Sequence, residues 1–176
     1  MKVTIIGGSG FIGTRIVDHF TQFKGYDFHI VDIRDSHFFN DITTIGDVRN
    51  QQQMDSALAG TDLVILLAAQ HRDNVTPTSL YYDTNVGGMR TTLHAMERNG
   101  VKRILFFSSV AVYGINKDNP DETSPKDPFN HYGKSKWQAE QLLQEWHTMH
   151  ADWNINVVRP TVTAGERKRG NVYNVI

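Results

Sequence analysis

The chain has 176 residues, which suits one domain with a full hydrophobic core, and its 18 Lys and Arg residues nearly balance 19 Asp and Glu residues. The resulting net charge of −1 favours neither a nucleic-acid partner nor a membrane surface. Cysteine is absent, which excludes a disulfide framework and a thiolate metal site, and the chain lacks both a signal peptide and a membrane-length apolar run, so we expect a cytoplasmic protein.

An apolar run at residues 3–6 predicts a buried first strand, and a turn of small residues connects it to a helix. Apolar residues at helical spacing predict the helix face that packs on the sheet: Ile12, Ile16, Val17 and Phe20. A strand, a tight turn and a helix N-terminus form an anion site, because backbone N–H groups and the helix dipole point at a phosphate. We therefore predict that a phosphate-bearing ligand binds at this turn.

Two registers of a glycine motif overlap in the turn. Gly8, Gly10 and Gly13 match G-x-G-x-x-G, whereas Gly7, Gly10 and Gly13 match G-x-x-G-x-x-G. We prefer the second register, because the first glycine should follow the strand directly. Only glycine lets the backbone turn this tightly and lets a pyrophosphate approach this closely. A strand before the motif, a helix after it and an acid about 20 residues later are the context of a dinucleotide-binding site.

That acid is Asp32, which follows the second predicted strand at residues 26–31. An acid in this place accepts hydrogen bonds from the adenosine ribose hydroxyls and repels a 2′-phosphate. Asp32 therefore favours NAD over NADP. Arg34 lies close by and weakens this preference, since an arginine can accept the phosphate.

Strands and helices alternate along the rest of the chain. The predicted elements are strand 43–46, helix 51–59, strand 63–69, helix 78–99, strand 101–109, helix 131–150 and strand 155–158. The run 63–69 is apolar on both faces, which is typical of a parallel sheet covered on both sides. This alternation predicts an α/β fold with a doubly wound parallel sheet, the Rossmann fold, in strand order 3-2-1-4-5-6.

Tyr132 and Lys136 are four residues apart on a predicted helix, so both side chains project from one face. A tyrosine with a pKa of about 10 is a poor base, but a nearby ammonium stabilises the phenolate and lowers that pKa. Ser109, at the end of the fifth predicted strand, is placed to hold the same substrate oxygen. These three candidate catalytic residues predict proton transfer coupled to hydride transfer at carbon.

Four segments together resemble the extended short-chain dehydrogenase/reductase family, in its branch of nucleotide-sugar epimerases and dehydratases: GGSGFIG at 7–13, DVR at 47–49, SSVAVYG at 108–114 and YGKSK at 132–136. The resemblance implies that Asp47 and Val48 contact the adenine, that Ala68 and Ala69 line the cofactor, and that Asn85 orders the central helix. It also implies that Lys136 binds the nicotinamide ribose. The expected NAD-binding residues are therefore Gly7, Gly10, Phe11, Ile12, Gly13, Asp32, Asp47, Val48, Ala68, Ala69, Asn85, Tyr132 and Lys136.

The chain departs from this family in two ways. Family members continue into a smaller C-terminal domain that grips the nucleotide-sugar, so we expect residues 1–176 to be an NAD-binding domain truncated before that domain and poorly active alone. Val162 stands three residues after Arg159, where the family often has an asparagine. This replacement removes a side chain that the resemblance assigns to the pyrophosphate.

The expected activity is 4-epimerisation of a nucleotide-sugar through a transient 4-keto intermediate. Dehydratases of this branch carry acids just after the catalytic hydroxyl, where this chain has Val110 and Ala111, and neither can transfer a proton. A ketoreductase uses the same three residues and stays open, although Asp32 disfavours NADPH. A non-catalytic NAD-binding sensor also stays open, although such proteins tend to lose the tyrosine or the lysine. The resemblance further implies a homodimer paired through helices 78–99 and 131–150.

Overall fold

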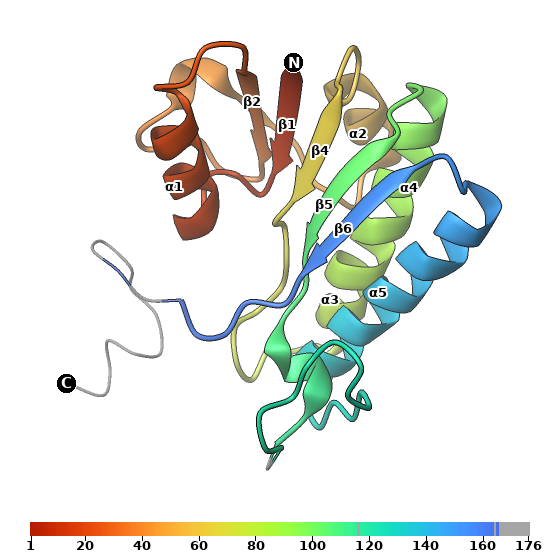
Figure 1. Cartoon of the computed structure of the whole chain (residues 1–176). Coiled ribbons are helices and arrows are strands. Elements are labelled where there is room, and N and C mark those ends of the chain that lie inside the picture. Colours follow the sequence, from red (N-terminus) through yellow and green to blue (C-terminus); the bar gives the residue numbers. More distant parts are fainter. Residues whose placement is uncertain (116, 164, 166–176) are drawn as a thin grey trace.

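A six-stranded parallel sheet forms the centre of the structure, a computed structural model that describes residues 1–115, 117–163 and 165 (Figure 1). Its strands are β1 (Lys2–Ile6), β2 (Asp27–Asp32), β3 (Thr43–Ile45), β4 (Leu63–Leu66), β5 (Arg103–Phe107) and β6 (Asn154–Val158). Their spatial order is β3-β2-β1-β4-β5-β6, and every pair is parallel. The predicted fold class and strand order are confirmed.

Helices cover both faces of the sheet, as a parallel sheet requires. The helical elements are α1 (Phe11–Phe20), η1 (Asn40–Ile42), α2 (Gln51–Ala57), α3 (Ser79–Tyr82), the π-helical turn η2 (Asp83–Gly87), α4 (Gly88–Arg98), η3 (Val110–Tyr113) and α5 (His131–Met149). Figure 1 shows α1 on one face, and α2, α4 and α5 on the other. No helix in the described part of the chain is long and apolar enough to cross a membrane.

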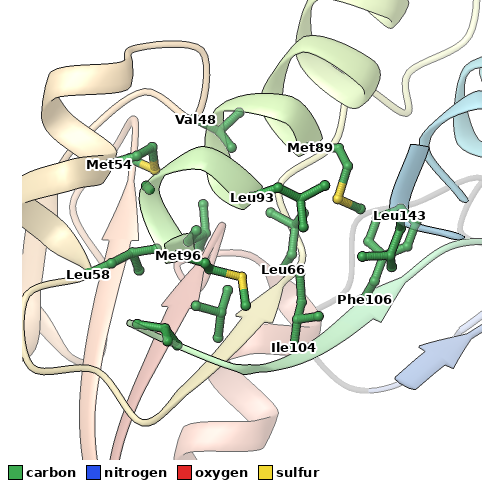
Figure 2. Close-up of a cluster of buried hydrophobic side chains, with 14 of the residues drawn as sticks. Val48, Met54, Leu58, Leu66, Met89, Leu93, Met96, Ile104, Phe106 and Leu143 are labelled. Carbon is green, nitrogen blue, oxygen red and sulfur yellow. The ribbon is translucent and has the colours of Figure 1, made fainter. Parts of the chain in front are cut away.

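The larger hydrophobic core lies between the sheet and helices α2, α4 and α5 (Figure 2). The side chains labelled there are Val48, Met54, Leu58, Leu66, Met89, Leu93, Met96, Ile104, Phe106 and Leu143. A smaller core under α1 contains Val3, Ile5, Val17, Phe28, Ile30 and Ile65. Successive side chains of a strand point to opposite faces, so Ile5 enters one core and Ile6 the other.

Tertiary contacts change several predicted elements. The predicted helix 78–99 contains the π-helical turn η2, and β4 ends at Leu66 because the N–H groups of the next two residues both donate to the Ile6 carbonyl. Phe20 does not pack on the sheet as predicted. It is 39% exposed and its ring contacts Phe23, because it lies at the very end of α1. Leu143 and Trp146 of α5 are buried in the core of the chain.

Candidate active site

The candidate site lies at the carboxyl edge of the sheet, where β1 and β4 are neighbours although their connections leave in opposite directions. Open parallel sheets bind ligands outside the carboxyl ends of their strands at this kind of switch point. The glycine turn follows β1, Asp32 ends β2, Ala68 follows β4 and Ser109 follows β5. The fold therefore gathers the sequence-predicted residues along one edge.

The glycine turn is shaped by contacts that leave no room for side chains. Gly7 has φ of +85°, and a Cβ on it would lie 2.4 Å from the backbone nitrogen of Ala68. A Cβ on Gly13 would lie 2.4 Å from the carbonyl oxygen of Gly8. At Gly10 the nearest atom to such a Cβ is 3.5 Å away, an ordinary contact. Packing thus requires glycine at 7 and 13, whereas glycine at 10 keeps open space beside the N-terminus of α1, which suits a pyrophosphate.

Asp32 connects the glycine turn to the end of β2. Its Oδ2 accepts a hydrogen bond from the Ser9 N–H at 3.0 Å, and its Oδ1 accepts one from the Arg34 N–H at 3.3 Å. The Ser9 hydroxyl in turn donates to the Arg34 carbonyl at 2.9 Å. A carboxylate has about four acceptor sites, so both oxygens keep capacity for ribose hydroxyls.

Asp47 and Val48 occupy different environments after β3. The Arg49 guanidinium donates to both Asp47 oxygens and holds the pKa of that carboxyl below its usual value. Val48 is 5% exposed and packs so tightly against α4 that a Cβ on Gly88 would lie 2.7 Å from its Cγ1. The Val48 side chain is therefore committed to the core, which leaves its backbone for the adenine contact that the family resemblance implies.

Asn85 joins the loop after β4 to helix α5 from within the π-helical turn. Its Oδ1 accepts from the Gln70 N–H at 2.8 Å, while its Nδ2 donates to the Gln70 carbonyl at 3.1 Å and to the Ser135 hydroxyl at 2.8 Å. Ser135, in turn, donates to the Tyr132 carbonyl at 2.8 Å. This network supports the backbone beside Ala69 and the first turn of α5. Sequence reasoning missed the role of Ser135, because its partner Asn85 lies 50 residues away in the chain.

Ser109 and Tyr132 meet where α5 approaches η3. Ser109 caps η3, accepting from the Ala111 N–H at 3.1 Å, and Asn130 caps α5, accepting from the Gly133 N–H at 2.8 Å. A Cβ on Gly133 would lie 2.6 Å from the Ala111 carbonyl oxygen, so only glycine permits this approach. Burial raises the pKa of Tyr132, and a hydrogen bond with the Ser109 side chain opposes that effect. The two side chains are therefore neighbours, as the predicted chemistry requires.

Lys136 is buried, with 1% of its surface exposed. Its Nζ donates to the Phe107 carbonyl at 2.6 Å and lies 4.2 Å from the centroid of the Phe106 ring. Burial lowers the pKa of Lys136 to about 7, and the Glu140 carboxylate opposes this effect. The expectation that Lys136 lowers the pKa of Tyr132 is not met: that pKa is raised, because burial disfavours the phenolate and the ammonium is engaged with β5.

The remaining residues that bear on the sequence predictions lie around η3 and α5. Val162 is 72% exposed and Val110 and Ala111 form the first residues of η3, so no acid follows Ser109 in this turn. Within residues 1–115, 117–163 and 165, no cluster of His, Asp and Glu side chains could hold a metal ion. Glu140, which sequence reasoning did not single out, is fully buried against Arg159.

Comparisons with known proteins agree with this geometry. The sequence profile of the NAD dependent epimerase/dehydratase family matches residues 3–176. An Escherichia coli O157:H7 protein named N-acetyl-alpha-D-glucosaminyl-diphospho-ditrans,octacis-undecaprenol 4-epimerase is 59% identical over 99% of this chain and 53% of its own length. UDP-glucose 4-epimerase of Lacticaseibacillus casei is 32% identical over 98% of this chain and 54% of its own length. The chain thus spans about half the length of the curated relatives it matches.

Solved structures show the same similarity. A crystal structure of UDP-galactose 4-epimerase superposes with a TM-score of 0.84 at 27% identity, covering 98% of this chain and 60% of that one. UDP-glucose 4-epimerase of Bifidobacterium longum, crystallised with NAD⁺ and UDP, gives a TM-score of 0.80 at 31% identity, covering 90% of this chain and 52% of that one.

Proposed function

Because the chain belongs to the NAD-dependent epimerase/dehydratase family, we propose that the whole protein is an NAD-dependent 4-epimerase of a sugar carried on a diphosphate. The observation that carries the proposal is the proximity of Ser109 and Tyr132 at the carboxyl edge of the sheet, the same edge that carries the glycine turn. Residues 1–176 are then the NAD-binding domain, and substrate contacts also come from the rest of the protein.

The described residues fit NAD. The open space at Gly10 suits the pyrophosphate, and Asp32 has acceptor capacity for the adenosine ribose. Ser108 Oγ is a buried polar atom without a hydrogen-bond partner in the described part of the chain, and it lies beside the site at the end of β5. When bound, oxidised NAD would accept the hydride that leaves C4 of the sugar, and its positive charge would favour the phenolate of Tyr132.

The three candidate catalytic residues divide the proton work. Ser109 holds the O4 oxygen of the sugar by a hydrogen bond and relays its proton. Tyr132 removes that proton as the 4-keto sugar forms. After the sugar has rotated, the hydride held by the cofactor would go back to the opposite face of C4 while Tyr132 returns the proton to the oxygen, so neither is consumed. Lys136, one helical turn from Tyr132, would bind the nicotinamide ribose. The raised pKa of Tyr132 means that the cofactor-free chain holds the tyrosine as a phenol.

Two carriers are open for the sugar, a nucleoside diphosphate and a polyprenyl diphosphate. The relative at 59% identity is named for N-acetylglucosamine on undecaprenyl diphosphate, whereas relatives named for UDP-glucose are 27–33% identical. Both carriers present the same sugar 1-diphosphate. The higher identity favours the polyprenyl carrier, and the nucleotide-sugar that the sequence analysis predicts is the second candidate.

The elimination chemistry of a dehydratase finds less support. It needs an acid and a base for the leaving hydroxyl in addition to the tyrosine, and η3 offers Val110 and Ala111 beside Ser109.

We also propose a homodimer in the cytoplasm, paired through the outer faces of α4 and α5. Leu143 and Trp146 take no part in that pairing, because both are buried within the chain. Light scattering at micromolar concentration tests the dimer, and a monomeric mass for the whole protein would contradict it.

The decisive experiment is a substrate panel with the full-length protein. UDP-glucose, UDP-N-acetylglucosamine and undecaprenyl-diphospho-N-acetylglucosamine are incubated with NAD, and the 4-epimers are separated by chromatography. We expect epimerisation without net NADH, and a loss of about 10²–10⁴-fold in turnover for Tyr132→Phe with nearly unchanged NAD affinity. Stoichiometric NADH would indicate a dehydrogenase, and parental turnover in Tyr132→Phe would contradict the role of this residue.

A further inference from the structure

A buried ion pair joins α5 to the segment that follows β6. Glu140 has 0% of its surface exposed and lies one helical turn after Lys136. The Arg159 guanidinium donates two hydrogen bonds to the Glu140 carboxylate, from Nε to Oε1 at 3.0 Å and from Nη2 to Oε2 at 2.7 Å. A buried carboxylate is costly unless it is paired and hydrogen-bonded, and its removal leaves the partner charge uncompensated. The pair is therefore a specific structural contact.

Arg159 extends this contact to the turn that carries Ser109. Its Nη1 donates to the Tyr113 hydroxyl at 2.8 Å, and its guanidinium lies 5.3 Å from the centroid of the Tyr113 ring. Tyr113 is 4% exposed and ends η3, the turn that Ser109 caps. Glu140, Arg159 and Tyr113 thus form one connected group between α5 and η3.

The backbone around Arg159 also holds both neighbours of Ser109. The carbonyls of the residues before and after Arg159 accept hydrogen bonds from the N–H groups of Ser108 and Val110, at 2.7 and 3.2 Å. A displacement of the backbone at Arg159 would therefore act on the two residues that flank Ser109. Arg159, which is paired with Glu140, is therefore connected to the turn of Ser109 in two ways: by its side chain through Tyr113, and by the adjoining backbone carbonyls.

We propose that Glu140 is a positioning residue for the candidate catalytic set: through Arg159 it holds the Ser109 turn against the helix that carries Tyr132 and Lys136. The inference rests on the proposed function, because it assigns a role within that reaction. Glu140 acts through other residues, since both of its oxygens are occupied by Arg159.

Glu140 has a second effect, on the charge of Lys136. Around the Lys136 ammonium, β5 presents an aromatic ring and the Phe107 carbonyl, and α5 presents the Glu140 carboxylate. Arg159 lies beyond that carboxylate, bound to Tyr113 of η3. Burial lowers the pKa of Lys136 to about 7 and Glu140 raises it, so removal of the carboxylate charge lowers the ammonium population at neutral pH.

The test uses Glu140→Gln in the full-length protein, with Glu145→Gln as the matched control, because Glu145 is exposed on the same helix. A displacement of about 1 Å can cost about 10²-fold in rate, so we expect Glu140→Gln to lower kcat by about 10–100-fold with a smaller change in KM. The loss should grow as pH rises toward 7, where the variant's lysine has already lost its proton and the parent's has not, and it should level off above that pH. Arg159→Lys should lower kcat without this pH shift, because Glu140 keeps its charge, and Glu145→Gln should match the parent.

Two results would overturn the inference. One is a Glu140→Gln variant with the kcat and pH profile of the parent. The other is a loss of kcat no larger than the loss of folded protein that thermal unfolding measures in the same variant. If the parent protein epimerises no sugar of the panel, the proposed function fails by itself. The inference is then decided by the ¹³Cε resonance of Lys136, assigned by its disappearance in Lys136→Met. A lower titration midpoint in Glu140→Gln supports it, and equal midpoints refute it.

Discussion

Gly133→Ala tests whether the close approach of α5 to η3 sets the catalytic geometry. A Cβ at this position would lie 2.6 Å from the Ala111 carbonyl oxygen and 3.0 Å from Pro128 Cβ. An ordinary contact begins at 3.4 Å, so helix and turn must separate by about 0.8 Å. Because Tyr132 precedes Gly133 and Ser109 caps the turn of Ala111, this separation acts directly on the Ser109–Tyr132 pair. A shift of this size should lower kcat by about 10²-fold.

The effect of Gly133→Ala on stability should be much smaller than its effect on rate. Overpacking costs about 1–3 kcal/mol, whereas alanine gains about 1 kcal/mol over glycine in a helix. The expected net loss is therefore about 0–2 kcal/mol, and each kcal/mol shifts Tm by about 2–4 °C at this chain length.

Gly87→Ala is the matched control for this substitution. Gly87 is also helical, but the nearest atom to a Cβ there, outside the adjoining turns of the helix, is the Tyr82 carbonyl oxygen at an ordinary 3.8 Å. It should therefore keep parental turnover and gain slightly in Tm. Turnover of the full-length protein and thermal unfolding by circular dichroism measure both effects. If Gly133→Ala retains parental kcat, the contact between α5 and η3 does not set the distance between Ser109 and Tyr132.

Three further substitutions address the cofactor, the buried lysine and the asparagine network. Asp32→Ala should weaken NAD binding in a fluorescence titration and relax discrimination against NADP, and tighter NADP than NAD binding by the parent would contradict this. Burial lowers the pKa of Lys136 from 10.5 to about 7, so between these values the unfolded chain binds more protons and stability rises with pH. Lys136→Met should flatten that rise in urea-unfolding free energy, and parallel profiles would refute the shift. Asn85→Asp leaves the Gln70 carbonyl and the Ser135 hydroxyl without their amide donor. It should lower the unfolding free energy by about 1–3 kcal/mol in the same assay, and an unchanged value would show that these hydrogen bonds do not stabilise the fold.

Local patterns in the sequence were sufficient for the strand order and for the position of the glycine turn. Apolar runs of strand length and apolar residues at helical spacing depend on backbone geometry alone, so they survive in any tertiary context. The boundaries were less predictable: β4 ends at Leu66 instead of continuing to residue 69, because two N–H groups turn toward the Ile6 carbonyl of another strand. These two hydrogen bonds form only because β1 is the neighbour of β4, which the local sequence of β4 does not specify.

The candidate site shows the same division between local pattern and long-range contact. The spacing of Tyr132 and Lys136 puts both on one face of α5, whatever packs against it. The direction of the Lys136 ammonium depends on the Phe107 carbonyl of β5, and the raised pKa of Tyr132 depends on how deeply α5 is buried. Sequence spacing therefore predicted which side chains share a face of α5, but it did not predict that burial raises the pKa of Tyr132 in the cofactor-free chain.

The sequence by itself determined the α/β class, the strand order, the glycine turn and the family resemblance, because short local motifs and the alternation of strand and helix patterns are enough to predict each of these. Only the tertiary structure decided that Asn85 ties Gln70 to Ser135, that Gly133 lets α5 touch η3, and that Glu140 is paired with Arg159. These contacts join residues that lie 15 to 50 positions apart. Such partners are chosen by the packing of helices on a sheet, and a buried polar group is stable only where that packing supplies its partner.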